Sequence, residues 1–319
     1  MQTTVFTMLA AFVSCVILTP ILIPTLIKFK FGQNILEELK HHRKKAGTPT
    51  MGGIMIIFSS ILAALIFAHS TPEVVMAVCT IAGFALLGLT DDMMKIKRGK
   101  NKGLRPNQKL VGQIVIAIIF ILFWRTMYSF STEILIPFFP DSSLDLGSAY
   151  PVFAILVFLS ATNGANLTDG VDGLASSVTI IIALFFVGAA VVLNSAVAPV
   201  GGAIAGALLA FLIFNSYPGK IMMGDTGSLA LGGFVAVMAL ILQMPLFLLL
   251  VAVIYVAESL SVIIQVSYFK RTGKRVFKMA PIHHSFELSG WSETKIVALF
   301  TVVTVLGASV GYIALVGFR

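Results

Sequence analysis

Two adjacent aspartates, Asp91 and Asp92, stand where an apolar run ends and a strongly basic segment begins. Carboxylates near a membrane are costly, and two neighbouring carboxylates repel each other, so both stay ionised only beside compensating positive charge. A divalent cation supplies such charge, and hard oxygen ligands favour Mg²⁺ over zinc. The pair therefore indicates a magnesium site, with a merely capped or solvated helix end as the alternative.

A third candidate carboxylate, Asp225, lies between Gly224 and Gly227 in the run Met-Gly-Asp-Thr-Gly-Ser. Glycines let a ligand approach the backbone closely, and a helix beginning at Ser228 would offer free N–H groups to phosphate oxygens. The run therefore favours a phosphate or metal site. A simple helix cap by Asp225 or Ser228 is the competing interpretation.

Two further runs are polar where the chain should only turn. Asn166-Leu-Thr-Asp169-Gly170-Val-Asp172-Gly is made of standard turn residues, but its two carboxylates exceed what a turn needs. Ala-Pro-Ile-His283-His284 places two imidazoles in a basic loop, as phosphate contacts or as plain surface residues. Their spacing does not resemble a zinc site, and no thiol partners are present.

Most of the chain must lie in lipid. Its residues are 58% hydrophobic and 11% charged, whereas soluble domains are about 25% charged. The first apolar run lacks a basic leader region and a small-residue cleavage site, so we expect a retained helix and not a signal peptide. We expect an all-α polytopic membrane protein, one domain over residues 1–319, whose membrane-spanning helices number about ten. The expected spans are 4–27, 51–69, 74–91, 109–126, 151–163, 174–193, 198–215, 227–243, 245–268 and 295–317. The ninth is long enough to tilt or kink.

The basic residues fix the expected orientation. All but Arg125 and Arg319 of the 22 Lys and Arg fall on alternate loops, which the positive-inside rule places in the cytoplasm, with both termini outside. This distribution argues against nucleic-acid binding. Setting topology and attracting anionic lipids explains most of these charges. By the same parity every motif loop is cytoplasmic, so the chemistry should gather on that face.

Other features are weaker. Residues 127–150 contain strand-like stretches and predict a small hairpin on the outer side. Glycine pairs at 202–206 and 307–311 predict close helix packing, with dimerisation as a minority interpretation. Cys15 and Cys79 fall within spans and are expected to be small core residues.

One predicted span carries a polar stripe. Glu258, Ser261 and Gln265 share a helix face, which must meet the bundle interior or a water-filled cleft. Interhelical hydrogen bonding explains the stripe without any site. Gln265, near the cytoplasmic end, is the better candidate for a ligand contact.

Six motifs in order resemble the phospho-N-acetylmuramoyl-pentapeptide transferase family over essentially the whole chain. They are Gly47-Thr-Pro-Thr-Met-Gly-Gly53, Thr90-Asp-Asp92, Asn166-Leu-Thr-Asp-Gly-Val-Asp-Gly173, Asn215-x-x-Pro, Met223-Gly-Asp-x-Gly-Ser228 and Met279-Ala-Pro-Ile-His-His284. Each motif alone is weak, but the ordered set is specific. The chain departs from the family pattern at Ser285, where a third histidine is usual, and at Met222, where phenylalanine is usual.

The resemblance implies a ten-helix enzyme of the bacterial cytoplasmic membrane, dependent on Mg²⁺. It implies transfer of phospho-MurNAc-pentapeptide from UDP-MurNAc-pentapeptide to undecaprenyl phosphate, giving lipid I and UMP, with membrane lipids as partners. By motif, the catalytic positions are Asp91, Asp92, Asp225 and His283, and the first three are candidate metal ligands, Asp225 foremost. The positions that match the nucleotide-sugar cleft are Lys45, Thr50, Asn166, Asp169, Gly170, Asp172, Asn215, Gln265 and His284, and Gly224 is a further expected substrate contact. Lys95 and Lys109 are expected partners of the pyrophosphate or of the lipid phosphate.

Phosphoryl transfer requires positioning and charge neutralisation more than covalent chemistry, which suits these residues. We expect direct attack by the lipid phosphate, with Asp91 accepting or holding its proton, over a covalent aspartyl-phosphate. One alternative function is that of a related enzyme that transfers GlcNAc-1-phosphate or another hexose-1-phosphate to the same lipid, because such an enzyme shares the aspartate motifs. A transporter would need ionisable residues near the midplane of several helices, where only Glu258 is expected. A structural scaffold would not need clustered aspartates in glycine-rich turns.

Overall fold

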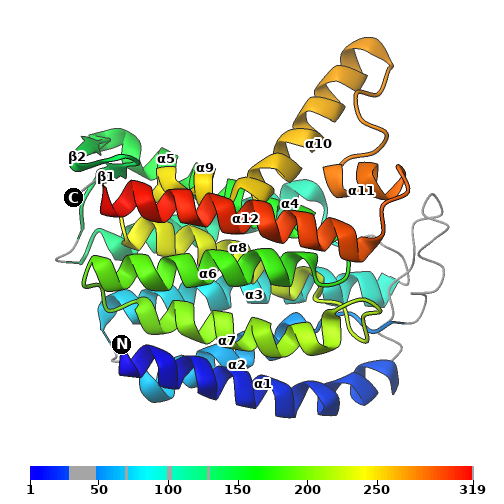
Figure 1. Ribbon diagram of the computed structural model, residues 1–319, viewed down its shortest axis with the longest axis horizontal. Coiled ribbons are helices and arrows are strands. Elements are labelled where there is room, and N and C mark those ends of the chain that lie inside the picture. The colour runs from blue at the N-terminus through cyan, green and yellow to red at the C-terminus, as the bar shows by residue number, and fades with distance from the viewer. Residues whose placement is uncertain (29–47, 69–70, 99–102, 128–129, 318–319) are drawn as a thin grey trace.

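A computed structural model describes residues 1–28, 48–68, 71–98, 103–127 and 130–317. Each of the ten predicted spans corresponds to helical structure (Figure 1). The helices are α1 (Gln2–Lys28), α2 (Gly53–Phe67), α3 (Pro72–Arg98), α4 (Pro106–Trp124), α5 (Tyr150–Thr168), α6 (Leu174–Val192), α7 (Ala198–Asn215), α8 (Gly224–Ile241), α9 (Leu248–Val251), α10 (Val253–Thr272), α11 (Ile282–Glu287) and α12 (Glu293–Val316). In the described part, nine are long and apolar enough to cross a membrane, and α2 is shorter at 15 residues.

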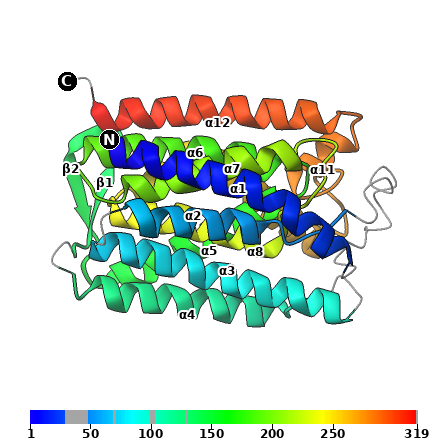
Figure 2. The ribbon, with the colours of Figure 1, turned by 90° about the horizontal axis from the view of Figure 1, so that it is seen from below.

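The helices form a bundle around α8. Every residue of α8 from Thr226 to Ile241 is buried. By contrast, α1, α4 and α12 line the outside of the bundle (Figure 2). Their apolar side chains, such as Ile21, Ile119 and Leu306, are largely exposed. An apolar outer surface around a closely packed centre is what a bundle surrounded by lipid requires.

Glycines let the helices pack closely. A Cβ at Gly206 of α7 would lie 2.0 Å from the Met8 carbonyl oxygen of α1, and one at Gly202 would lie 2.8 Å from the Thr4 carbonyl oxygen. A Cβ at Gly307 of α12 would lie 2.2 Å from the Leu250 carbonyl oxygen. The predicted packing role of both glycine pairs is therefore confirmed within one chain.

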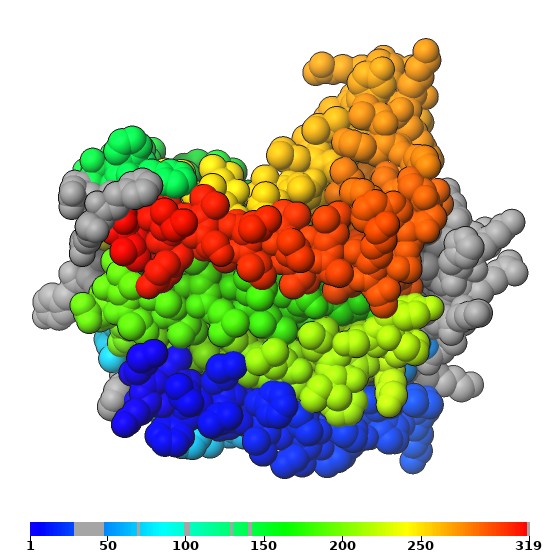
Figure 3. All heavy atoms as spheres, viewed as in Figure 1, coloured from blue at the N-terminus to red at the C-terminus, as the bar shows by residue number. Residues whose placement is uncertain are grey.

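The ninth span is broken, as its length predicted. It begins as a short 3₁₀ turn, η3 (Pro245–Phe247), continues as α9 and restarts as α10 after Ala252, whose φ of −102° and ψ of 31° leave the helical region. From this break α10 leans away from the other helices and projects from the body (Figures 1 and 3).

The predicted hairpin is present. Strands β1 (Glu133–Ile136) and β2 (Phe139–Asp145) pair antiparallel and are followed by the 3₁₀ turn η2 (Gly147–Ala149). Leu135 N–H donates to the Gln243 carbonyl and Phe138 N–H to the Ala314 carbonyl, which anchors the hairpin to the ends of α8 and α12. The N-terminus of α1 and the C-terminus of α12 lie at this end of the bundle, and α11 lies at the opposite end (Figure 1).

Three predicted boundaries are wrong in detail. The third span does not end at Asp91, because α3 continues to Arg98 as an extended polar helix. Asn166 belongs to the last turn of α5, so the polar run begins inside a helix and not in a tight turn. Helix α8 starts at Gly224 and not at Ser228, so Asp225 lies in its first turn.

The prediction for the two cysteines is half right. Cys15 is buried as predicted, but Cys79, on α3, is exposed.

Candidate functional site

Asp92 joins α3 to the start of α8. Its Oδ1 accepts a hydrogen bond from the Asp225 backbone N–H (3.1 Å). Its Oδ2 accepts from the backbone N–H (2.9 Å) and the hydroxyl (2.7 Å) of Thr226. The carboxylate thus satisfies N–H groups that the first turn of a helix leaves unpaired. Asp92 is buried at 3% exposure, and both its oxygens are engaged by protein donors.

Asp91, one residue earlier, faces the loop before α4. Its Oδ1 accepts from the Leu104 backbone N–H at 2.6 Å, and its Oδ2 lies 2.8 Å from the Lys95 ammonium. Gly103 passes against the carboxylate, since a Cβ at that position would lie 2.4 Å from Oδ1. The glycine lets the loop close over Asp91 and fixes the orientation of its side chain.

Asp225 is the centre of the charged network. Its Oδ2 lies 2.8 Å from Lys109 Nζ and 3.0 Å from Lys95 Nζ, and its Oδ1 accepts from Asn166 Nδ2 at 3.0 Å. Asn166 also accepts from Lys109 at 3.1 Å. Helices α3 and α8 can meet here because of Gly88, where a Cβ would lie 2.1 Å from the Asp225 carbonyl oxygen.

The three aspartates could hold a metal ion. One carboxylate oxygen from each of Asp91, Asp92 and Asp225 lies within 4.8 Å of the others. Such an all-oxygen set fits Mg²⁺, which is bound through few carboxylates together with water and substrate phosphates. With all groups ionised, Lys95 and Lys109 leave the cluster one net negative charge, so the donor set fits a divalent cation.

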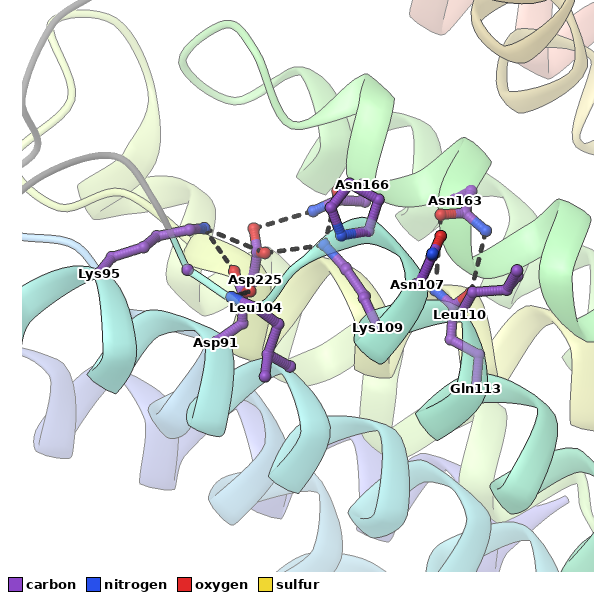
Figure 4. A pocket seen from close by; sticks show the side chains of 12 residues that line it. Asp91, Lys95, Leu104, Asn107, Lys109, Leu110, Gln113, Asn163, Asn166 and Asp225 are labelled. Atoms are coloured by element: carbon purple, nitrogen blue, oxygen red, sulfur yellow. Dashed lines mark hydrogen bonds and ion pairs between the residues drawn. The ribbon is translucent and has the colours of Figure 1, made fainter. Parts of the chain in front are cut away.

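A cavity of about 540 Å³ opens beside this network (Figure 4). Its lining residues are Asp91, Lys95, Gly103, Leu104, Pro106, Asn107, Lys109, Leu110, Gln113, Asn163, Asn166 and Asp225. One end therefore carries carboxylates and ammonium groups, and the other carries neutral amides. This combination suits an anionic ligand held against a cation.

The turn between α5 and α6 lies next to the cluster. Burial raises the pKa of Asp169 well above its usual range, and the negative charges of Asp225 and Asp92 raise it further, while a hydrogen bond from the Gly224 backbone opposes the rise. Asp172 accepts from the Gly219 N–H at 2.9 Å and ties this turn to the loop before α8. The turn is thus held firmly on the aspartate cluster.

Asn215, at the end of α7, also connects two segments: the start of α6 and the loop before α8. Its Oδ1 accepts from the Gly173 N–H and the Ser176 hydroxyl, both at 3.1 Å, and its Nδ2 donates to the Ile221 carbonyl at 2.9 Å. These contacts engage its amide group with two backbone groups and one hydroxyl of the protein itself. Asn215 therefore shapes the loops of the site from behind.

The two histidines occupy different settings. His283 Nδ1 donates to Glu258 Oε1 at 3.0 Å, and its buried Nε2 has no partner among the described residues. That nitrogen faces the α5–α6 turn, because a Cβ at Gly170 would lie 2.1 Å from it. His284 instead pairs with Glu287, with 2.6 Å between Nδ1 and Oε2. Only His283 points a free nitrogen toward the turn that carries Asp169.

Two positions that sequence patterns singled out serve the loop before α11. Gln265 accepts from the N–H groups of Val276 and Phe277 and donates to the Phe277 carbonyl, so its amide is used by this loop. Ser285 accepts from the Met279 N–H at 3.1 Å and donates to its carbonyl at 2.6 Å. The serine at the departure from the family pattern therefore closes the loop.

The segment before α2 supports the start of α8. Met222 N–H donates to the Pro49 carbonyl at 2.8 Å, and Gly52 N–H to the Met222 carbonyl at 2.9 Å. Thr50 lies against Gly224, where a Cβ would be 2.8 Å from its hydroxyl oxygen. Met222 therefore contributes backbone contacts whatever its side chain. Lys45 lies outside the described residues.

The structure thus brings six of the predicted residues into one network. Asp91, Asp92, Lys95, Lys109, Asn166 and Asp225 are in direct contact, and Asp169, Gly170, Thr50 and His283 adjoin them. Sequence reasoning missed Gln113 and Asn163. A signal existed, because each lies about one helical turn from a predicted site residue on the same face, Lys109 or Asn166.

Comparison with known proteins agrees with this site. Residues 74–243 match glycosyl transferase family 4, and residues 45–57 match the phospho-N-acetylmuramoyl-pentapeptide-transferase signature 1. The chain is 44% identical over 319 residues to the phospho-N-acetylmuramoyl-pentapeptide-transferase of Clostridium novyi, covering 99% of this chain and 98% of the relative. It is 47% identical over 314 residues to that of Clostridium perfringens strain 13, covering 98% of each. For Clostridium kluyveri the identity is 48% over 314 residues, covering 98% of this chain and 99% of the relative. The chain therefore belongs to the phospho-N-acetylmuramoyl-pentapeptide transferases within glycosyl transferase family 4.

Proposed function

We propose that this protein transfers phospho-MurNAc-pentapeptide from UDP-MurNAc-pentapeptide to undecaprenyl phosphate, forming lipid I and releasing UMP. The observation that carries the proposal is the contact of Lys95 and Lys109 with Asp225 in a cavity at one end of an apolar bundle. Phosphoryl transfer is promoted by such charge placement. The family membership supports the choice of this sugar donor and of a lipid acceptor.

In the proposed reaction an oxygen of the lipid phosphate attacks the β-phosphorus of the nucleotide-sugar. The bond between that phosphorus and the bridging oxygen breaks, and UMP leaves with the oxygen. Lys95 and Lys109 would hold the phosphates, and Asp91 would hold or accept the remaining proton of the acceptor. The second pKa of a phosphate monoester is about 6, so little base strength is required.

A resident Mg²⁺ would be held by Asp225 and Asp91. Asp92 fits this role less well, because backbone N–H groups and the Thr226 hydroxyl at the start of α8 hold its two oxygens. Flexible lysine side chains are among the partners of Asp225 and Asp91, and these could move aside for an ion. When bound, the ion would neutralise charge that develops on the leaving UMP. Asn166 would keep Asp225 oriented through its 3.0 Å hydrogen bond.

The direct reaction is favoured over a covalent aspartyl-phosphate. Asp225 is held on two ammonium groups and an amide, and a carboxylate engaged in this way is a poor nucleophile. Asp91 is likewise engaged by Leu104 and Lys95. Incubating the enzyme with labelled nucleotide-sugar alone tests this point, since a radiolabelled protein would contradict it.

We place the enzyme in the bacterial cytoplasmic membrane, with the aspartate end facing the cytoplasm and both termini outside. The basic residues Lys95, Lys109 and Lys278 lie at the aspartate end, as the positive-inside rule requires. A homodimer stays a prediction. Reporter fusions after Asn194 and after Lys220 test the orientation, because they should report opposite sides of the membrane.

The decisive experiment mixes purified protein, undecaprenyl phosphate and UDP-MurNAc-pentapeptide, with and without Mg²⁺, and follows UMP release. We expect UMP only when both substrates and the ion are present. UDP-GlcNAc serves as the matched donor. UMP release from UDP-GlcNAc alone would instead support the related hexose-1-phosphate transferase, and no UMP from either donor would contradict both.

A further inference from the structure

The cavity extends beyond the charged cluster to a pair of neutral amides. Gln113 of α4 and Asn163 of α5 face each other there, with 3.1 Å between Asn163 Nδ2 and Gln113 Oε1 and 3.5 Å between Gln113 Nε2 and Asn163 Oδ1 (Figure 4). Gln113 is 1% exposed, yet it lines the cavity. Neither residue belongs to the metal cluster or contacts the histidines.

The Gln113–Asn163 pair lies about one helical turn from the Lys109–Asn166 pair, on the same two helices. Gln113 follows Lys109 by four residues on α4, and Asn163 precedes Asn166 by three on α5. At about 1.5 Å per residue, the amide pair lies roughly 4.5–6 Å further along the bundle than the Lys109–Asn166 pair. This spacing is similar to the width of a phosphate group, so one phosphate could contact both pairs.

Gln113 has hydrogen-bonding capacity to spare. Its Nε2 carries two hydrogens, and the one hydrogen bond that the described residues give it is long, at 3.5 Å. A ligand oxygen could therefore replace this contact at small cost. Asn163 Nδ2 is held more firmly, by Gln113 and by the Leu159 carbonyl at 2.8 Å.

We propose that Gln113, supported by Asn163, binds the phosphate of the membrane-anchored acceptor and positions it for attack. This inference rests on the proposed function. The pair lies on the apolar side of the cluster and next to Leu110, which lines the cavity and is 42% exposed on the outer surface of the bundle. A hydrocarbon chain attached to that phosphate can therefore leave past Leu110 into the lipid.

Neutral donors suit a phosphate that must act as a nucleophile. A third ammonium group would hold the dianion more tightly but would also withdraw electron density from the attacking oxygen. Amide N–H groups fix the direction of the phosphate and leave its charge intact. The water-soluble nucleotide-sugar would instead approach from the side of Asp169 and His283. The acceptor phosphate and the donor would therefore occupy different parts of the site.

The test combines one double variant with two matched partners. In Gln113→Leu/Asn163→Leu both amides are replaced by apolar groups of similar size, which keeps helix packing nearly unchanged in energy. The swap Gln113→Asn/Asn163→Gln retains both amides. Thr162→Val is the control, since Thr162 is a buried neighbour on α5 that bonds its own helix at the Phe158 carbonyl.

For each protein we would measure the apparent melting temperature, the KM for a short-chain polyprenyl phosphate and the KM for UDP-MurNAc-pentapeptide. We expect the leucine pair to raise the acceptor KM about tenfold or more, with the donor KM within about twofold. The swap should recover much of this loss, and Thr162→Val should match wild type. An unchanged acceptor KM in a folded leucine variant would overturn the proposal, and equal rises in both KM values would assign the pair to general packing.

A second variant serves if the leucine pair does not fold. Gln113→Glu keeps an oxygen for Asn163 Nδ2 but places a negative charge at the proposed phosphate, so acceptor binding should fall at least as far. Binding of labelled polyprenyl phosphate, measured without nucleotide-sugar, reads this subsite even if no UMP forms. Wild-type binding that Gln113→Glu abolishes would support the subsite, and equal binding by both proteins would refute it. UMP release by wild type reports separately on the proposed function.

Discussion

Glu258 and His283 form a buried carboxylate–imidazole pair, with 3.0 Å between Glu258 Oε1 and His283 Nδ1. The second carboxylate oxygen, Oε2, accepts from the Ile282 backbone N–H at 2.8 Å. Both residues are 0% exposed. One glutamate thus orients the ring and fixes the start of α11, which leaves His283 Nε2 directed at the turn between α5 and α6.

Replacing Glu258 by Gln should therefore reduce turnover by about tenfold. A carboxamide offers one acceptor oxygen, whereas the Ile282 N–H and the His283 ring need two, and an unpaired buried donor costs about 1–3 kcal/mol. The measurement is the rate of UMP release at saturating substrates. Glu287→Gln is the control, because its partner His284 is partly exposed. Equal losses in both variants would show that the buried pair has no special role.

Removing the charge of Asp225 should nearly abolish activity. Asp225→Asn keeps the shape of the side chain but removes the negative charge that Lys95 and Lys109 contact at 3.0 and 2.8 Å. We expect a loss of at least about a hundredfold in rate, as for other preorganised electrostatic groups, and a weaker response to added Mg²⁺. Asp145→Asn, on the exposed hairpin at the far end, should behave as wild type. A near-normal rate would count against Asp225 as a metal ligand.

Asp91 and Asp92 should differ in what their loss affects. Asp92 holds two backbone N–H groups and a hydroxyl at the start of α8, so Asp92→Asn should lower stability by about 1–2 kcal/mol. Asp91 accepts from the single Leu104 N–H and pairs with Lys95. Asp91→Asn should therefore reduce turnover with a smaller change in melting temperature. Thermal unfolding in detergent beside UMP assays separates the two, and identical profiles would contradict the division.

The sequence was sufficient for the features that depend on composition and period. Apolar length predicts all ten spans, and loop parity predicts that Asp91, Asp169, Asp225 and His283 lie at one end of the bundle, where the structure has them. Side-chain partners were not accessible in this way. The contact of Glu258 with His283 depends on how α10 leans after the break at Ala252, and a one-dimensional pattern carries no such angle.

The same limit explains Gln265 and Asn166. Gln265 shares a helix face with Glu258, as predicted, but the loop at Val276 and Phe277 folds back and takes its amide. The sequence pattern predicts a turn at Asn166, because Asn, Asp and Gly favour turns in isolation. In the folded chain, its hydrogen bonds to Asp225, Ser228 and Lys109 stabilise one more helical turn of α5.

Gly170 gives the most specific test of the His283 position. A Cβ at Gly170 would lie 2.1 Å from His283 Nε2, so Gly170→Ala must displace either the ring or the turn that carries Asp169. Because the ring is tethered to Glu258 and buried, we expect turnover to fall more than tenfold while the protein stays folded. Gly188→Ala on α6 is the matched control, since its Cβ would meet Tyr312 at an ordinary 3.7 Å.

Combining Gly170→Ala with His283→Ala removes the clash together with the ring. If His283 acts through Nε2, the double variant should be no more active than His283→Ala alone. Full activity in Gly170→Ala would mean that the ring does not occupy this position in the working enzyme.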